Sequence, residues 1–332
     1  MYKMTNLDYS FIVKELSALA GKHFSRIRKL GEGLYRMKIG STEILSENGI
    51  RLHATKYIEE AGIPDKFVQK VSKELDNAKL LSVEQINNDR VVSFNFNMGQ
   101  LVFELFSDGN IILVRDGKTV CAARYETWAG REIKAGEEYK PPPNIPSEKL
   151  ELSDRYIITS LVKLPFGKEY ALEALARAGI NEKKPGSELS KEEVSRLEGE
   201  LATIKKSASP YVFYQEGKPV AFSLAKLSEY KDMESRHFPT LSEAADEYYA
   251  SVERPDPRLE KLLQRLEKQQ KRLPSLSEEE KKNKAKGDFV YQKYTEIERI
   301  LELARAGSFG DIEIKYKGKV NKKEKSVEVE IQ

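Results

Sequence analysis

Two turn motifs, Asp108-Gly109 and Asp116-Gly117, constrain the fold of this chain most strongly, because they lie eight residues apart. Asp-Gly favours the two-residue turns of β-hairpins, whose backbone requires positive φ. The apolar run between them, Asn110 to Arg115, is therefore predicted to be a strand of an antiparallel sheet. Upstream, glycines divide the chain into similarly short segments: Gly31, Gly33, Gly40 and Gly49. Together these features predict a curved antiparallel sheet with helices at its edge.

Helical spacing of apolar residues predicts a first helix over residues 6–20, closed by Gly21. The run Pro141-Pro142-Pro143 cannot continue a sheet ladder and ends the β-rich region. Three helices are expected next, and the last begins at a capping box: Tyr156–Leu164, Gly167–Ala178, and Ser190 with Glu193 through Ile204. The tight glycine-containing turn between the first two either presents backbone amides to a phosphate or belongs to a plain helical bundle.

The remaining chain predicts a small β element, a short helix and a charged arm. Tyr211–Leu224 turns at Glu216-Gly217, and Leu241–Ser251 is helical. Apolar residues then recur near heptad positions, first in Leu259, Leu262, Leu266 and Leu273, and later in Val290, Tyr294, Ile297, Leu301 and Ala304. Because Pro274 separates the two groups, we expect a helical hairpin broken there. Two strands are expected within Asp311–Gln332, from Ile312, Ile314 and Tyr316 and from Val327, Val329 and Ile331.

Composition limits the classes of function. The chain has 56 Lys and Arg against 53 Asp and Glu, a net charge of +3, so any nucleic-acid surface must come from clustering. One cysteine, Cys121, and three histidines make a disulfide framework or a zinc site unexpected, so we predict no metal and no cofactor. No apolar run approaches the roughly 20 residues of a membrane span, and no signal-peptide core is seen, so we expect a cytosolic protein without a membrane partner.

A polar cluster, Asn87-Asn88-Asp89-Arg90, precedes the β-rich run Val91–Phe96. The carboxylate of Asp89 suits hydrogen bonds from the exocyclic amines of a base, or it fixes the plane of an arginine. The guanidinium of Arg90 suits stacking on a base or a forked contact with a phosphate. The alternative is a turn before a strand, with Arg90 as a solvated edge charge. Gly31-Glu32-Gly33 lacks the spacing of a phosphate loop and is interpreted as a hairpin turn. With no catalytic constellation in view, we predict no catalytic residues and no enzyme.

The order of motifs around this cluster resembles the amino-terminal domain of the NFACT family, which contains RqcH, NEMF and FbpA-like proteins. The motifs are P-x-x-F-V from Pro64, L-x-N-A from Leu75, Q-x-x-x-D-R-V-V-x-F from Gln85, G-x-L-x-x-E-L-F-x-D-G-N-I-I-L from Gly99, R-E-I-K-A-G-E-E-Y-K-P-P-P from Arg131 and L-P-F-G-K-E-Y-A from Leu164. The resemblance covers most of the chain. One departure is that Val71-Ser72-Lys73-Glu74 replaces a usual Leu-Arg-Lys-His run, which leaves an RNA contact there without support.

The resemblance implies an RNA-binding factor of ribosome-associated quality control. Such a protein binds tRNA and the large ribosomal subunit obstructed by peptidyl-tRNA, and it supports carboxy-terminal tailing of the stalled chain. The family's Asp-Arg pair matches Asp89 and Arg90, so these residues and Asn88 are expected to contact tRNA. Lys261, Arg265 and Lys268 form either a solvated flank of the coiled coil or, on a ribosome-binding protein, contacts to ribosomal RNA phosphates. No DNA partner is expected. The family also continues beyond the length of this chain, so we expect a fragment or a shortened relative.

The resemblance also refines the fold to α+β with five parts. These are an NFACT-N β-rich domain like that of MutM glycosylases (1–143), a helix-hairpin-helix-like domain (150–207), a small α/β completion of the first module (208–252), a coiled-coil hairpin (253–306) and a short β segment (307–332). MutM enzymes use an amino-terminal proline and usually a cysteine zinc finger, whereas this chain has Tyr2 and one cysteine. The alternatives are a cytosolic protein-interaction module acting through the hairpin, or an inactive MutM-like nucleic-acid-binding scaffold.

Overall fold

The computed structural model describes residues 2–329 apart from 59–61, 129, 144–145, 148, 208, 252–256 and 322–325. Side chains of residues 257–264, 267, 268, 271 and 320 also lie outside the description. The chain divides into two compact units, Met1–Arg254 and Pro255–Gln332, which are described separately. The finer division at residues 143, 207 and 306 stays a prediction.

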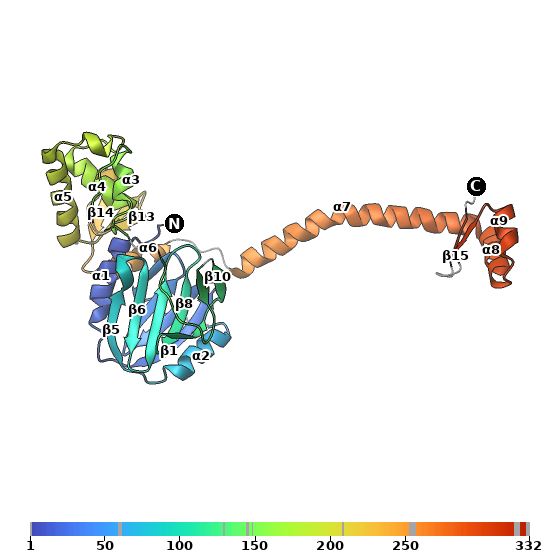
Figure 1. The fold of residues 1–332 in the computed structure, drawn as a ribbon, viewed down its shortest axis with the longest axis horizontal. Coiled ribbons are helices and arrows are strands. Elements are labelled where there is room, and N and C mark those ends of the chain that lie inside the picture. The colour runs from blue at the N-terminus through green and yellow to red at the C-terminus, as the bar shows by residue number, and fades with distance from the viewer. Residues whose placement is uncertain are drawn as a thin grey trace. The chain divides into compact units, whose positions relative to one another are not determined.

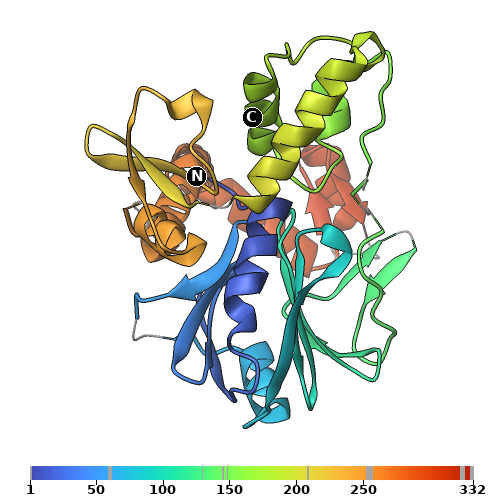
Figure 2. The same cartoon turned by 90° about the vertical axis from the view of Figure 1, so that its left-hand side faces the viewer.

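The first unit is built on two antiparallel sheets. The first has the order β1-β2-β3-β4, with β1 (Phe24–Gly31), β2 (Leu34–Ile39), β3 (Thr42–Glu47) and β4 (Arg51–Thr55). The second has the order β5-β6-β7-β8-β9, with β5 (Leu80–Gln85), β6 (Val91–Phe96), β7 (Gly99–Glu104), β8 (Asn110–Arg115) and β9 (Lys118–Ala122). Figure 2 shows α1 (Asn6–Ser17) between them, and apolar residues of both sheets join one core around it.

The hairpin turns also bring the two sheets together. The predicted strand Asn110–Arg115 is confirmed as β8. At its start Gly109 has φ +61°, and a Cβ there would lie 2.7 Å from the Cα of Asn48. Gly49, which follows Asn48 in the β3–β4 turn, would place a Cβ 2.0 Å from the carbonyl oxygen of Ser107. Glycine is therefore required at both turns because the backbones of two hairpins meet there.

Further elements surround the sheets. The helix α2 (Lys66–Glu74) contacts β1 and β9, one edge strand of each sheet, and buries Phe67 and Val71 in the same core. The hairpin of β10 (Glu126–Trp128) and β11 (Arg131–Ile133) packs on the outer face of the second sheet. The helical part contains α3 (Ile157–Leu161), α4 (Lys168–Ala178) and α5 (Lys191–Lys206), and α5 begins at the predicted capping box of Ser190 and Glu193. A smaller sheet follows, in the order β13-β12-β14, with β12 (Tyr211–Gln215), β13 (Lys218–Ser223) and β14 (Glu234–His237), and α6 (Leu241–Ser251) closes the unit.

The second unit contains α7 (Pro257–Gln292), α8 (Tyr294–Arg305), α9 (Phe309–Lys315), β15 (Lys319–Asn321) and β16 (Ser326–Glu328), as Figure 1 shows. The break expected at Pro274 is wrong, since α7 continues through it. An internal proline removes one backbone hydrogen-bond donor and destabilises a helix by roughly 3 kcal/mol relative to alanine. The residues around Pro274 are exposed, so water can hydrogen-bond to the carbonyl that loses its partner. Leu266 and Leu273 are also exposed, so these heptad positions do not pack against a returning helix within the described residues.

The strand expected over Ile312–Tyr316 is also wrong, because these residues belong to α9 and its carboxyl cap. Only Ile312 is buried, whereas Ile314 is 83% exposed, so the alternating pattern does not mark a buried sheet face. The α+β class built from antiparallel sheets is confirmed. Within the described part of the chain, no helix is both long enough and apolar enough to cross a membrane.

Candidate functional site

The Asp89-Arg90 pair lies in the connection between β5 and β6. A single 3-10 turn, Ile86–Asn88, interrupts the chain before β6 begins at Val91. Asn87 and Asn88 have φ of 55° and 53°, a left-handed conformation that asparagine tolerates better than most residues. The backbone is thus a turn followed by a strand. That geometry leaves Asn88 exposed and both members of the pair half-buried.

Asp89 is fixed by neighbours from two elements. Its Oδ1 accepts hydrogen bonds from the backbone amide of Arg90 at 2.7 Å and from Asn6 Nδ2 at 3.3 Å. The side chain of Gln85 donates to the carbonyls of Asp89 at 2.8 Å and Asn6 at 2.9 Å. The carboxylate is therefore tied to the first residue of α1, and the turn is held in one orientation.

The Arg90 guanidinium has no hydrogen-bond or ion-pair partner among the described residues. It lies near Tyr9, whose hydroxyl is buried and has no partner within the described part. Burial raises the pKa of Tyr9, and the positive charge of Arg90 partly opposes that shift. Because a half-buried cation with open donors can accept an anionic or aromatic ligand, Arg90 is the group of this turn best suited to a ligand.

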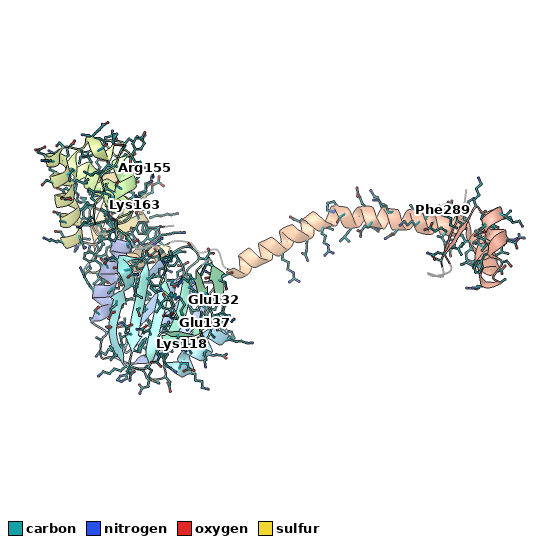
Figure 3. The ribbon with its side chains drawn as sticks, viewed as in Figure 1. Lys118, Glu132, Glu137, Arg155, Lys163 and Phe289 are labelled. Carbon is teal, nitrogen blue, oxygen red and sulfur yellow. The ribbon has the colours of Figure 1, made fainter. Side chains whose placement is uncertain are left out.

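A groove of about 590 Å³ runs beside this cation. Asn6, Asp89 and Arg90 lie on one side of it, and Lys163, Leu164 and Gly167 from the helical part also line it. Lys163 is labelled in the helical part in Figure 3. The structure therefore brings together the Asp-Arg cluster and the glycine-containing turn before α4, two motifs that are far apart in the sequence.

Gly167 allows the start of α4 to lie close to the start of α1 at the groove. Its φ is +95°, and a Cβ added to it would lie 2.5 Å from Cγ2 of Thr5, the N-cap of α1. No side chain of the described residues caps α4, so within that part of the chain the first-turn amides of this 11-residue helix have no side-chain acceptor at the N-cap. A helix amino terminus carries partial positive charge and favours anions. The groove thus combines that terminus with Arg90 and Lys163.

Asp8 links α1 to α4 beside the groove, and it is not among the residues predicted from the sequence. Its buried carboxylate accepts from the Tyr170 hydroxyl at 2.5 Å and from the Thr5 amide at 2.7 Å. Tyr170, in α4, accepts in turn from the amide of Leu224 at 2.9 Å. Burial raises the pKa of Asp8 to about 6, although these hydrogen bonds act to lower it. The spacing of Thr5 and Asp8 is that of a capping box, which could have indicated this residue.

The other predicted contact residues lie in the second unit. Arg265 is exposed on α7, while the side chains of Lys261 and Lys268 lie outside the described residues. Their role on RNA stays a prediction. Among the described residues no group of His, Cys, Asp and Glu is arranged to hold a metal ion. Cys121 is buried, and burial raises its thiol pKa to about 11, so it remains protonated at neutral pH.

Comparison with known proteins finds a matching family and relatives that share one kind of name. A profile of the NFACT N-terminal and middle domains matches residues 6–331. The archaeal Rqc2 homolog of Methanocaldococcus jannaschii is 30% identical over 91% of this chain and 52% of its own length. The ribosome quality control complex subunit NEMF of Homo sapiens is 23% identical over 94% of this chain and 34% of its own length. The chain therefore spans about half or less of these relatives.

A solved structure supports the fold alone. A fibrinogen-binding protein from Staphylococcus aureus superposes with a TM-score of 0.59 at 19% identity, covering 74% of this chain and 98% of that protein. At this identity the likeness concerns the arrangement of sheets and helices.

Proposed function

Because the chain belongs to the NFACT family, we propose that it binds tRNA as an RNA-binding factor of ribosome-associated quality control. Curated relatives from an archaeon and from human are named as ribosome quality control proteins. The proposed partners are tRNA and a large ribosomal subunit obstructed by peptidyl-tRNA. In this proposal the chain supports tailing by binding and orienting RNA, and the peptide-bond chemistry belongs to the ribosome.

The observation that carries this proposal is the open guanidinium of Arg90 in the groove. Arg90, Lys163 and the amino terminus of α4 are three positive groups converging on one space, with Asp89 as the carboxylate beside them. Such an arrangement suits an RNA backbone, because arginine forks onto phosphate and a helix terminus offers backbone donors. Asp89 adds an acceptor for an exocyclic amine of a base. We place the anticodon arm of tRNA here.

The test is tRNA binding by the purified chain with Arg90→Ala, Asp89→Ala and a matched control. Arg90→Ala is expected to weaken binding roughly 10- to 100-fold, as for loss of a hydrogen bond to a charged group. It should also make the salt slope, which is the slope of the logarithm of the binding constant against the logarithm of the salt concentration, shallower by about 0.7 to 0.9. Arg196→Ala is the control, since Arg196 is an exposed cation on α5 outside the groove lining. Equal affinity of Arg90→Ala and Arg196→Ala, with both variants folded, would refute the placement.

The ribosomal subunit is assigned to the second unit. Lys261, Arg265 and Lys268 lie along α7, a helix of 36 residues, and a helix of that length can follow an RNA backbone across several phosphates. This part of the proposal rests on the charge pattern and on the relatives' names.

A protein-interaction module is a second candidate, favoured by apolar side chains left at the surface of α7. Leu266, Leu273 and Leu276 are each at least half exposed. RNA recovered with the purified chain distinguishes the two functions. Bound tRNA supports the first, and a tight protein partner without RNA supports the second.

A further inference from the structure

A second cavity lies at the same end of the sheet β5–β9 as Arg90. It has a volume of about 320 Å³, and we call it the tryptophan slot after its apolar lining of Phe106, Trp128, Pro142 and Pro143. Pro143 also lines the groove described above, so the two cavities adjoin. The backbone links them as well, because the Leu105 amide donates to the Arg90 carbonyl at 2.7 Å. Glu104 and Phe106, on either side of Leu105, both line the slot.

Trp128 is held in place and yet left at the surface. It ends β10, pairs with Arg131 of β11, and remains 45% exposed. The Arg131 guanidinium lies over its ring, with Cζ 5.4 Å from the centroid. Arg131 donates to both carboxylate oxygens of Glu104, and Tyr139 donates to the same group at 2.9 Å. Because this buried ion pair is well satisfied, the indole is a platform of fixed orientation.

Tyr139 strengthens that support. Burial raises the pKa of its hydroxyl, so the hydroxyl stays protonated and continues to donate to Glu104. The hairpin β10–β11, at the side of the β-rich part in Figure 1, is also packed by Ile133 against the outer face of the sheet. A large aromatic surface that is exposed while its supports are buried is suited to contact with another molecule.

The charges of the slot differ from those of the groove. Two cations and three carboxylates line the slot: Arg124, Arg131, Glu104, Asp108 and Glu126. Arg124 is already within 3.1 Å of Glu126 and 3.7 Å of Asp108. The slot therefore has no positive excess to attract a phosphate. Its aromatic ring, prolines and carboxylate acceptors suit the flat face and amino groups of a nucleobase.

We propose that the tryptophan slot takes one unstacked nucleobase of the RNA strand whose phosphates occupy the Arg90 groove. The base stacks on Trp128, and the neighbouring nucleotide passes Pro143 into the groove. This inference rests on the proposed function, since it needs RNA at Arg90. It adds a site for the base to a groove whose own groups contact mainly the backbone.

The chain provides its own reporter, because Trp128 is its single tryptophan. Titration of the full chain with bulk tRNA is expected to quench tryptophan emission, saturating over the same range as binding measured by filter retention. Trp128→Ala should weaken binding roughly 5- to 100-fold, the range for loss of one stacked base. It should leave the salt slope unchanged, because no phosphate contact is lost. Trp128→Phe should retain most of the affinity.

Tyr125→Ala is the matched control, because Tyr125 is an exposed aromatic (58%) just before β10 and outside the slot lining. Thermal melting verifies that each variant is folded. If tRNA binds without quenching and Trp128→Ala binds as tightly as Tyr125→Ala, the slot does not hold a base, while the function at Arg90 stands. If the wild-type chain binds no tRNA, both proposals fall. Quenching by an apolar peptide but not by RNA would reassign the slot to a protein partner.

Discussion

Replacing Asp8 by asparagine tests the buried carboxylate that joins the groove walls. Burial raises the pKa of Asp8 from its usual 3.8 to about 6 in the folded chain, despite hydrogen bonds from Tyr170 and Thr5. A shift of about two units corresponds to about 3 kcal/mol. Because the folded pKa is the higher one, the native state holds an extra proton between about pH 4 and 6. The contribution of this proton to the free energy of unfolding is complete below about pH 4 and is lost as the pH rises to about 6.

The measurement is chemical denaturation of the full chain from about pH 4 to 7, followed by far-UV circular dichroism. The free energy of unfolding of the wild type, minus that of Asp8→Asn, is expected to fall by up to about 3 kcal/mol across this range. Taking the difference removes other carboxylates that act in the opposite direction. One of these is Glu74, whose pKa is lowered by hydrogen bonds from Lys70 and Arg115.

Two parallel stability curves would refute the reasoning. They would mean that the hydrogen bonds from Tyr170 and Thr5 balance the cost of burial and that Asp8 stays ionised in the folded chain. A difference that rises with pH would mean that the hydrogen bonds outweigh burial. Asp8 would then be a conventional stabilising carboxylate.

Three further predictions concern the groove and the arm. Gly167→Ala should destabilise the first unit by about 2 to 4 kcal/mol in thermal or chemical unfolding, through positive φ and the contact with Thr5. Gly179→Ala, at positive φ but with open space around it, should cost only about 1 kcal/mol. Lys261→Glu, Arg265→Glu and Lys268→Glu together should make the salt slope of ribosome binding shallower by about 2 to 3 and leave tRNA binding nearly unchanged. Equal losses for both ligands would contradict the division between the units. The tRNA slope of the wild type should be roughly −2, because the groove offers about three phosphate contacts.

Local chemistry explains which elements were predictable. The strand Asn110–Arg115 follows from Asp-Gly turns, and the start of α5 follows from the capping box of Ser190 and Glu193. Each of these depends on residues that are close in sequence. Pro274 shows the limit of the same reasoning, since its cost within a helix is local while the continuation of α7 depends on many residues on either side.

The candidate site could be predicted only in part. The sequence marks the Asp89-Arg90 pair and the turn at Gly167 separately as features suited to RNA, but no local pattern predicts that they line one groove. That proximity depends on packing between α1 and α4, through Thr5 and Gly167. No local pattern marks Trp128, because its exposure depends on Arg131 and Glu104 holding the hairpin in place.

The placement of unpaired charge, rather than its total, defines this site. Many cations of the first unit lie within 4 Å of a carboxylate, including the pairs Arg26–Glu43, Arg51–Glu47, Arg131–Glu104, Arg177–Glu173 and Lys184–Glu193. Such pairs largely cancel at a distance, so they add little to the field that attracts an anion. Arg90 has no such partner among the described residues and faces a groove where a helix terminus adds positive potential. A net charge of +3 is therefore compatible with a local site for RNA, because one open cation in a groove attracts phosphate more effectively than several paired ones.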